Sequence, residues 1–123
     1  TLHESGHAEI QSHAYDLHRP PLGSAKKKSE SAEAYKTRLH DDLQKLQTQC
    51  AQHLNGYTPN AFTYPFGAIS ADSRAVLEQL GMVASFSCEE GINVIANSDS
   101  LFKLKRVNRT SKRSLESIMS KFG

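Results

Sequence analysis

Residues 61–67 read Ala-Phe-Thr-Tyr-Pro-Phe-Gly, and this short run determines how the rest of the chain is interpreted. Its first four residues favour a β-strand, because aromatic and β-branched side chains suit a pleated, half-buried surface. Pro65 favours extended backbone at Tyr64, and Gly67 allows the chain to turn. The sequence therefore predicts a short strand that ends in a Pro-Phe-Gly turn.

Helical patterns flank this strand on both sides. From about residue 31 to residue 54, apolar side chains recur every three or four positions, which is typical of one buried helix face. These apolar residues are Tyr35, Leu39, Leu43, Leu46, Cys50 and Leu54. A second helix is predicted over residues 71–80, with Ser70 as its N-cap and Gly81 just after its C-terminus.

Further strands are predicted at residues 8–12, at 82–87 and within 101–107. A final helix is expected after an N-cap at Thr110 or Ser111, with one apolar face formed by Leu115, Ile118, Met119 and Phe122. Strands that alternate with helices imply a parallel sheet with right-handed crossovers. We therefore predict an α/β fold whose chemistry lies at the C-terminal edge of the sheet.

Composition limits the class of protein. The chain has 123 residues, which suits one domain, and its 15 Lys and Arg nearly balance its 13 Asp and Glu. This charge balance argues against a nucleic-acid-binding protein with a basic surface. No apolar run approaches the ~20 residues of a transmembrane helix, so none is expected in this chain. The 2 cysteines exclude a disulfide-dense scaffold and a four-cysteine zinc site.

Histidines are concentrated near the start of the chain, and two of them follow a predicted strand. His13 and His18 are five positions apart, a spacing that fits neither one face of a helix nor one face of a strand. Both could bind one metal ion only if the chain bends between them, and a third ligand would be needed. From spacing alone, a surface loop that carries two histidines remains an alternative.

The Pro-Phe-Gly turn is the second candidate site. A turn at the end of a strand exposes backbone N–H groups, which can stabilise an oxyanion during acyl transfer. Its aromatic residues could also pack against a sugar ring. An ordinary Pro-Gly turn with hydrophobic flanks explains the same residues.

Taken together, these segments resemble the polysaccharide deacetylases. These enzymes form carbohydrate esterase family 4, and their catalytic domain is called the NodB-homology domain. Residues 9–18, Glu-Ile-Gln-Ser-His-Ala-Tyr-Asp-Leu-His, resemble the second motif of the family. The spacing of five is similar to that of the biofilm poly-N-acetylglucosamine deacetylases and their Gram-positive relatives. The resemblance implies that His13 and His18 bind a divalent metal, with Zn²⁺ expected and Co²⁺ or Ni²⁺ as alternatives. Ala14 stands where Ser or Thr is usual.

Residues 62–67 resemble the third motif, Phe-Arg-x-Pro-Tyr/Phe-Gly. The resemblance implies a catalytic role for Phe66, whose backbone N–H would belong to the oxyanion hole, and it implies that Tyr64 and Pro65 line the substrate groove. Thr63 replaces the arginine that usually orients the catalytic base. Residues 104–108, Leu-Lys-Arg-Val-Asn, resemble a late segment of this branch, but the customary late histidine has no counterpart.

The first motif of the family, Thr-Phe-Asp-Asp, is absent, although it supplies the base and one metal-binding aspartate. The Asp41-Asp42 pair follows both histidines and lies on a predicted helix, so it cannot be that motif in the usual order. The resemblance extends from about His3 to Phe122. We therefore expect residues 1–123 to be the C-terminal portion of one deacetylase domain, a partial, distorted (β/α) barrel that is catalytically incomplete by itself.

The resemblance implies metal-dependent removal of N-acetyl groups from a polymeric N-acetylhexosamine. The expected partner is a polysaccharide, either an N-acetylglucosamine polymer or peptidoglycan, and the expected location is extracellular or at the cell surface. Two alternatives remain open. One is a non-catalytic carbohydrate-binding descendant of the same fold, and the other is a small flavodoxin-like domain in which the histidines bind no metal.

Overall fold

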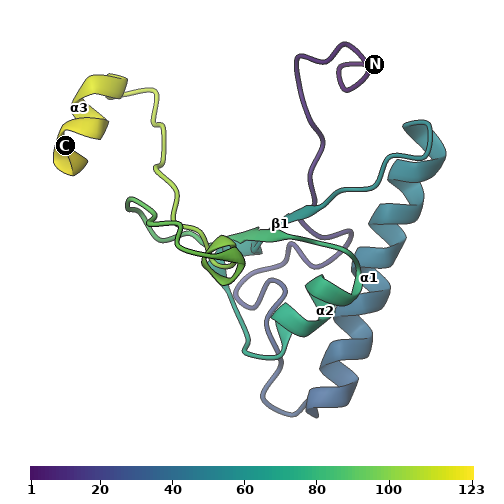
Figure 1. Ribbon diagram of the computed structural model, residues 1–123. Helices are drawn as coiled ribbons and strands as arrows, with labels where there is room; N and C mark the ends of the chain where they lie inside the picture. Colours follow the sequence, from purple (N-terminus) through teal and green to yellow (C-terminus); the bar gives the residue numbers. More distant parts are fainter.

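The computed structural model describes residues 1–123 and shows strands that alternate with helices, as the sequence predicts. The elements in chain order are helix α1 (Ala32–His53), strand β1 (Ala61–Thr63), the 3₁₀ turn η1 (Pro65–Gly67), helix α2 (Ser73–Gln79), strand β2 (Ala84–Phe86), the 3₁₀ turn η2 (Ser98–Leu101), helix α3 (Leu115–Met119) and the 3₁₀ turn η3 (Ser120–Phe122). Helices α1 and α2 lie side by side, and α3 lies apart from both of them (Figure 1).

The sheet is parallel throughout. Strand β1 pairs with β2, with Ala61 opposite Ala84 and Thr63 opposite Phe86. Single parallel bridges join Ser12 to β1 and Leu104 to β2. The predicted outer strands at 8–12 and 101–107 are therefore present only as one bridge each. All four segments run in the same direction, so their C-terminal ends meet at one edge of the sheet.

Helix α1 confirms the long helix that the apolar spacing predicts. It begins after Ser31, whose hydroxyl oxygen accepts a hydrogen bond from the Ala34 N–H at 3.1 Å, and this bond satisfies one of the unpaired donors of the first turn. It ends before Asn55 and Gly56, which both have positive φ. Four of the six stripe residues are buried, namely Tyr35, Leu39, Leu43 and Cys50.

The hydrophobic core lies where α1 and α2 meet the sheet. Its eight members come from these elements and the turns between them: Tyr35, Leu39, Leu43, Phe62, Tyr64, Val76, Leu77 and Met82. The rings of Phe62 and Tyr64 meet edge to face, with their centroids 4.9 Å apart. This packing holds the end of β1, and hence the Pro-Phe-Gly turn that follows it, in a fixed position.

Two predicted helix starts are wrong. Helix α2 begins at Ser73 rather than Ala71, because the Ser70 hydroxyl accepts a hydrogen bond from the Lys26 N–H and does not cap the helix. Helix α3 begins at Leu115, and its N-cap Ser114 lies three residues beyond Ser111 and four beyond Thr110.

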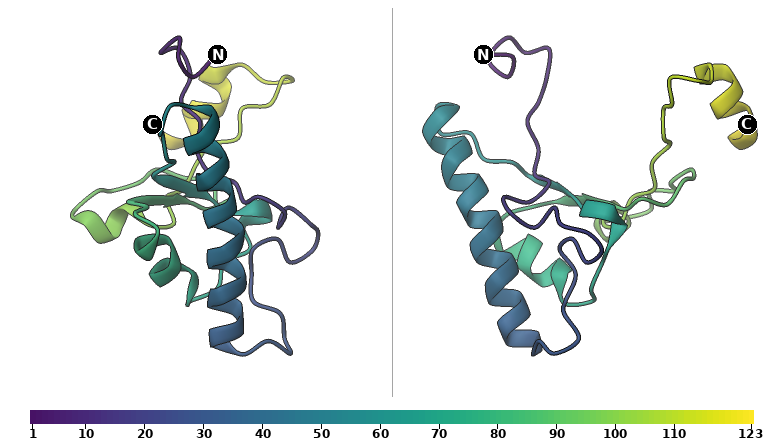
Figure 2. Two further views of the ribbon diagram at one scale, coloured as in Figure 1. Left: turned by 90° about the vertical axis from the view of Figure 1, so that its right-hand side faces the viewer. Right: turned by 180° about the vertical axis from the view of Figure 1, so that it is seen from behind.

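Of the apolar face predicted for the last helix, Ile118 is the only buried member, and Leu115 and Met119 are exposed. The right-hand view of Figure 2 shows α3 separated from the body of the molecule by an extended segment. None of the helices combines the length and the apolar composition that crossing a membrane would require.

Candidate functional site

His13 and His18 lie side by side at the C-terminal edge of the sheet. His13 directly follows the bridge at Ser12, and the chain then bends so that His18 returns toward it. The centroids of the two imidazole rings are 4.9 Å apart, with the ring planes tilted by 54°. Both side chains are exposed. The structure therefore brings together the two histidines that the sequence singled out.

A carboxylate on helix α1 holds the bend between the two histidines. The side chain of Asp42 accepts hydrogen bonds from the backbone N–H groups of Tyr15 and Asp16, both at 2.8 Å. Ala14 supports the bend with a φ of 72°, an unusual value for a residue that carries a Cβ. Sequence reasoning missed this role of Asp42. The one available signal was its position on the flank of the apolar stripe, next to Leu43.

The His13 ring is oriented by the neighbouring strand. Its Nδ1 lies 2.8 Å from the backbone carbonyl oxygen of Thr63 at the end of β1. A carbonyl oxygen can only accept a hydrogen bond, so this contact assigns the proton to Nδ1 and leaves the Nε2 lone pair free. Histidines that bind metals are commonly oriented in this way, through the ring nitrogen that does not bind the metal.

The Phe66 ring completes a row with the two histidines. Its centroid lies 4.5 Å from that of His18, and 45% of the side chain is exposed. Phe66 has φ 57° and ψ 11°, the left-handed region that bulky residues rarely adopt. Its backbone N–H donates to no atom of the chain, whereas the N–H groups of Gly67 and Ala68 donate to Tyr64 and Pro65 carbonyls. A turn that holds an unpaired backbone donor in place can serve as an oxyanion site.

Tyr64 and Pro65 do not face the solvent. The Tyr64 side chain is 1% exposed, and its hydroxyl lies 2.7 Å from Ser73 Oγ in the core. Burial raises the pKa of Tyr64 above its ordinary value. Pro65 is also buried. The side chains expected to line a substrate groove are thus buried in the core, because the residue that follows β1 continues the inward alternation of Phe62.

Two glycines allow the close packing around the turn. At Gly23, with φ +51°, an added Cβ would lie 2.6 Å from the Pro65 carbonyl oxygen. At Gly67, with φ +65°, an added Cβ would lie 2.8 Å from Cys88 Cβ. Contacts this short exclude any side chain unless the turn moves. Loop 19–25 and Cys88, which lies two residues past β2, therefore fix the Pro-Phe-Gly turn from two sides.

The site contains two metal-binding groups and no third. No group of three or more His, Cys, Asp or Glu side chains in residues 1–123 is arranged to hold a metal ion. Asp16, the nearest acidic residue in the sequence, pairs with Arg19 at 2.6 Å, and the hydrogen bond from Arg19 lowers the pKa of Asp16. Asp42 is occupied by the loop backbone. The residues present fit two imidazole ligands of a zinc-like ion, and catalytic zinc sites usually have three protein ligands.

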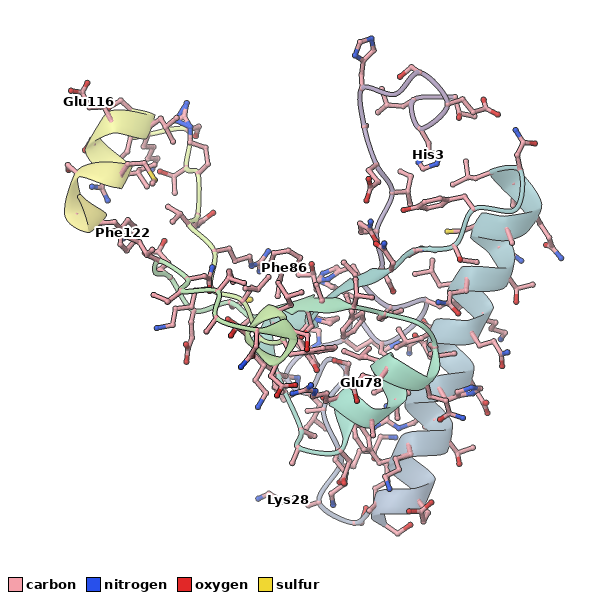
Figure 3. The ribbon with its side chains drawn as sticks, in the orientation of Figure 1. His3, Lys28, Glu78, Phe86, Glu116 and Phe122 are labelled. Atoms are coloured by element: carbon pink, nitrogen blue, oxygen red, sulfur yellow. The ribbon has the colours of Figure 1, made fainter.

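The other histidines lie elsewhere. His3 stacks on Tyr57 with ring centroids 4.2 Å apart, and Figure 3 shows it near the far end of α1. His40 and His53 lie on α1, and His40 contacts Asp41.

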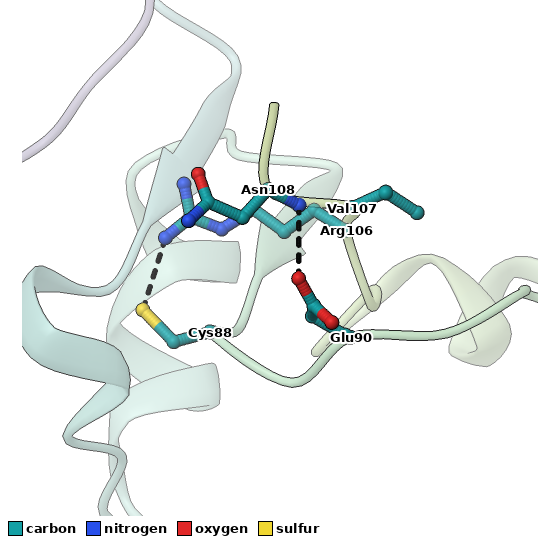
Figure 4. Close-up of a pocket in the computed structure, with 5 residues that line it drawn as sticks. All are labelled: Cys88, Glu90, Arg106, Val107 and Asn108. Atoms are coloured by element: carbon teal, nitrogen blue, oxygen red, sulfur yellow. Dashed lines mark hydrogen bonds between the residues drawn. The ribbon is translucent and has the colours of Figure 1, made fainter. Parts of the chain in front are cut away.

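A pocket of about 290 Å³ lies farther along the same sheet edge. It is lined by Cys88, Glu90, Arg106, Val107 and Asn108 (Figure 4). Cys88 and Cys50 are both free thiols, and burial raises the pKa of Cys50. The sequence marked residues 104–108 by their resemblance to a known segment but gave no role to any of them.

Comparison with known proteins gives a family and three solved structures. The polysaccharide deacetylase family profile matches residues 1–85. The de-N-acetylase of Aggregatibacter actinomycetemcomitans is 22% identical with a TM-score of 0.76, over 97% of this chain and 49% of that protein. IcaB from Ammonifex degensii is 22% identical with a TM-score of 0.68, over 89% of this chain and 45% of that protein.

The deacetylase domain of BpsB from Bordetella bronchiseptica is 23% identical with a TM-score of 0.65, over 73% of this chain and 40% of that one. The chain thus spans less than half the length of each of these structures and shares their fold over that part. No curated protein sequence matches the chain.

Proposed function

Because this chain belongs to the polysaccharide deacetylase family, we propose that it forms the C-terminal portion of a metal-dependent deacetylase domain. The reaction is hydrolysis of the N-acetyl group of a polymeric N-acetylhexosamine, and the complete domain is a distorted (β/α) barrel. The observation that carries this proposal is the row of His13, His18 and Phe66 at the edge of the sheet, with ring centroids 4.9 and 4.5 Å apart. This row places two metal-binding groups next to an unpaired backbone donor.

His13 and His18 hold the metal ion, with Zn²⁺ favoured and Co²⁺ or Ni²⁺ as alternatives. When bound, such an ion polarises a carbonyl group and lowers the pKa of water. The chain's own contribution is to orient the ligands. The Thr63 carbonyl holds the proton of His13 at Nδ1, and Asp42 fixes the loop that carries His18.

Phe66 stabilises the charge that develops on the acetamide oxygen. Its backbone N–H is free to donate to that oxygen, and removal of one such donor typically costs about 2.7–4 kcal/mol of transition-state stabilisation. Tyr64 and Pro65 act from below by holding the turn in place. Neither of their side chains needs to touch the substrate.

The catalytic base and the third metal ligand are not supplied by residues 1–123. Asp42 is bound to the loop backbone, and no acidic side chain joins the two histidines. We place both functions on carboxylates of the domain that lie outside these residues, and we expect residues 1–123 alone to be inactive. Thr63 stands where an arginine would orient the base, so this orientation must come from another residue.

We favour a polymer of N-acetylglucosamine as the substrate, with peptidoglycan as the second choice, and an extracellular or cell-surface location. Support comes from the fold shared with the de-N-acetylase and with the deacetylase domain of BpsB. A non-catalytic carbohydrate-binding descendant is the alternative function, favoured by the missing third ligand and by Thr63. A flavodoxin-like domain does not agree with the family match.

The test is acetate release from N-acetylglucosamine oligomers by the longest natural form of the protein that contains these residues, supplied with Zn²⁺. We expect acetate from the wild type and at least a hundredfold less from His18→Ala, because a lost metal ligand removes the main electrophile. His53→Ala, which changes an exposed histidine at the end of α1, is the matched control. Binding of oligomers without acetate release would support the carbohydrate-binding alternative instead.

A further inference from the structure

The C-terminal ends of the four parallel segments form one continuous edge. In order across the sheet they carry His13, the turn at Phe66, Cys88 and Arg106. Neighbouring strands lie about 4.8 Å apart, so this edge extends about 14 Å from His13 to Arg106. The candidate reaction site occupies the first half of the edge, and the pocket beside Cys88 occupies the second half.

The reaction turn and the pocket share a wall. Gly67 packs so closely on Cys88 that an added Cβ would lie 2.8 Å from the cysteine Cβ and 3.3 Å from its Sγ. Cys88 in turn lines the pocket. Only the Cys88 side chain lies between the turn and the pocket at this point, so an extended polymer bound at Phe66 has to pass one small side chain to enter the pocket.

Arg106 is fixed at this wall by two hydrogen bonds, which use only some of its N–H donors. Its Nε donates to the Ser87 carbonyl oxygen at 2.7 Å, and its Nη2 donates to Cys88 Sγ at 2.9 Å (Figure 4). A guanidinium group has five N–H donors, so three remain without a partner in the chain. A fixed guanidinium with free donors is well suited to bind hydroxyl and carbonyl oxygens.

The opposite side of the pocket is polar and balanced in charge. Glu90 accepts a hydrogen bond from the Asn108 backbone N–H at 3.3 Å and pairs with Lys121. The hydrogen bond from Lys121, with that from Asn108, lowers the pKa of Glu90. The Asn108 side-chain amide is exposed and makes no hydrogen bond within the chain, so it is free to bind a ligand. This lining suits a neutral, hydroxyl-rich ligand better than an anion.

We propose that this pocket is a binding site for a sugar unit that lies at least two units along the polymer from the unit that reacts, with Arg106 and Asn108 as its binding residues. The proposal rests on the deacetylase function proposed above and adds a determinant of substrate length to it. A short oligomer at the histidines does not reach the pocket. A longer one fills it and gains the hydrogen bonds of both residues.

The test compares acetate release from N-acetylglucosamine dimers and hexamers by wild type, Asn108→Ala and Arg106→Gln. We expect kcat/KM for the hexamer to fall about tenfold in Arg106→Gln and about threefold in Asn108→Ala, the equivalents of one charged and one neutral hydrogen bond. The value for the dimer stays within about twofold in both variants. Arg109→Gln, an exposed arginine outside the pocket, is the matched control and changes neither value.

Arg106 also ties two backbone segments together, so its loss could disturb the fold. Asn108→Ala removes no contact within the chain and keeps the test valid. Equal losses for dimer and hexamer, or no loss in either variant, would overturn the proposal. If the wild type releases no acetate from any oligomer, the proposed function fails. Calorimetric titration with the hexamer then tests whether the pocket binds sugar. Weaker hexamer binding in both variants supports it, and unchanged or absent binding refutes it.

Discussion

The position of His18 depends on a residue of α1 that binds no ligand itself. Asp42 accepts two backbone hydrogen bonds from residues 15 and 16, and these bonds fold the loop that returns His18 to His13. The Thr63 carbonyl has the same kind of role for the His13 ring. Both contacts act through the orientation of a ligand, and orienting groups of this type commonly change metal affinity by about 10–100-fold.

Asp42→Ala should therefore weaken Zn²⁺ binding by about tenfold or more, because the loop loses both hydrogen bonds and His18 is no longer held beside His13. Isothermal titration calorimetry with the metal measures this change. Asp41→Ala is the control, since Asp41 is exposed and contacts His40 instead of the loop. Equal affinities in the two variants would show that the loop keeps its shape without Asp42.

The spacing of the histidines was sufficient to predict that the chain bends between them, but not what makes it bend. Asp42 and Thr63 contact the histidine segment across 26 to 50 positions of the sequence. The local sequence pattern cannot predict contacts between residues so far apart in the chain. The burial of Tyr64 was missed for a related reason, because both the inward alternation and the backbone pairing with Phe86 continue one residue past Thr63, where strand β1 ends.

At the level of elements, the Pro-Phe-Gly turn depends on the loop beneath it. Gly23→Ala should lower the free energy of unfolding by about 2–4 kcal/mol, because the new Cβ meets a backbone oxygen at 2.6 Å and also requires a positive φ. Gly56→Ala is the matched control. Its φ is also positive, at +82°, but it has open space around it, so the substitution should cost only about 1 kcal/mol.

Urea denaturation of the two glycine variants gives both free energies. Because the Gly23 clash displaces the Pro65–Phe66 peptide, the same variant should also lower kcat for acetate release more than Gly56→Ala does. Equal effects of the two substitutions would mean that the turn is free to move away from loop 19–25.

Loop 25–30 is tied to α1 by a bidentate ion pair. Arg38 donates from Nε to Glu30 Oε1 at 2.7 Å and from Nη2 to Oε2 at 2.9 Å, and the two side chains are only 24% and 10% exposed. The hydrogen bonds from Arg38 lower the pKa of Glu30 from its ordinary value of 4.5 to about 2. The folded state therefore holds this carboxylate charged over a pH range in which the unfolded chain would protonate it.

Stabilisation by Glu30 should be complete above pH 4.5 and should be lost as the pH falls toward 2. Glu30→Gln is expected to cost about 2 kcal/mol at pH 7 and progressively less at lower pH, as measured by urea denaturation from pH 7 to pH 3. The control Glu33→Gln removes an exposed pair with Lys36 and should cost less than about 0.5 kcal/mol at either pH. A cost for Glu30→Gln that does not change with pH would contradict the assignment.

Helix α1 was the most predictable element, because apolar residues recur every three or four positions along most of its 22 residues, Ser31 caps its start, and Asn55 and Gly56 follow its end. The shorter helices were predicted at the right places with the wrong starts. Ser70 and Ser111 are reasonable N-caps by residue type, but tertiary contacts use Ser70 elsewhere, and Ser114 caps the last helix. Residue preferences therefore identify several possible N-caps, and tertiary contacts determine which of them starts the helix.

At the scale of the whole molecule, the core and the C-terminal segment differ in how firmly they are held. Helix α1 contributes three fully buried side chains to the core. Helix α3 lies apart from the body (Figure 1), and its region is linked to the rest by the half-exposed pair of Lys121 and Glu90. Exposed ion pairs of this kind contribute little stability.

Amide hydrogen exchange should therefore be slowest in the middle of α1 and much faster in residues 109–123, because local opening of the C-terminal segment exposes only one buried apolar side chain, Ile118. Exchange measured by mass spectrometry on peptides from the two regions tests this directly. Similar protection of α3 and α1 would mean that the C-terminal segment is packed more firmly than its contacts indicate.

The overall architecture was predictable because strands that alternate with helices admit few arrangements other than a parallel sheet. The sheet edge then placed both candidate motifs together, although they are about 50 positions apart in the sequence. The extent of the sheet was not predictable. The outer segments at Ser12 and Leu104 each contribute a single bridge, whereas strand propensity predicted pairing over several residues in each segment.

The proposed function depends above all on His13 and His18 binding one metal ion together. Equilibrium dialysis of the longest natural form of the protein against Zn²⁺, followed by elemental analysis, measures the bound metal in wild type, His13→Ala, His18→Ala and the control His53→Ala. We predict one ion per chain in the wild type and the control, and loss of the ion in each of the other two variants. Absence of bound metal in the wild type, or equal binding in all four proteins, would contradict the claim.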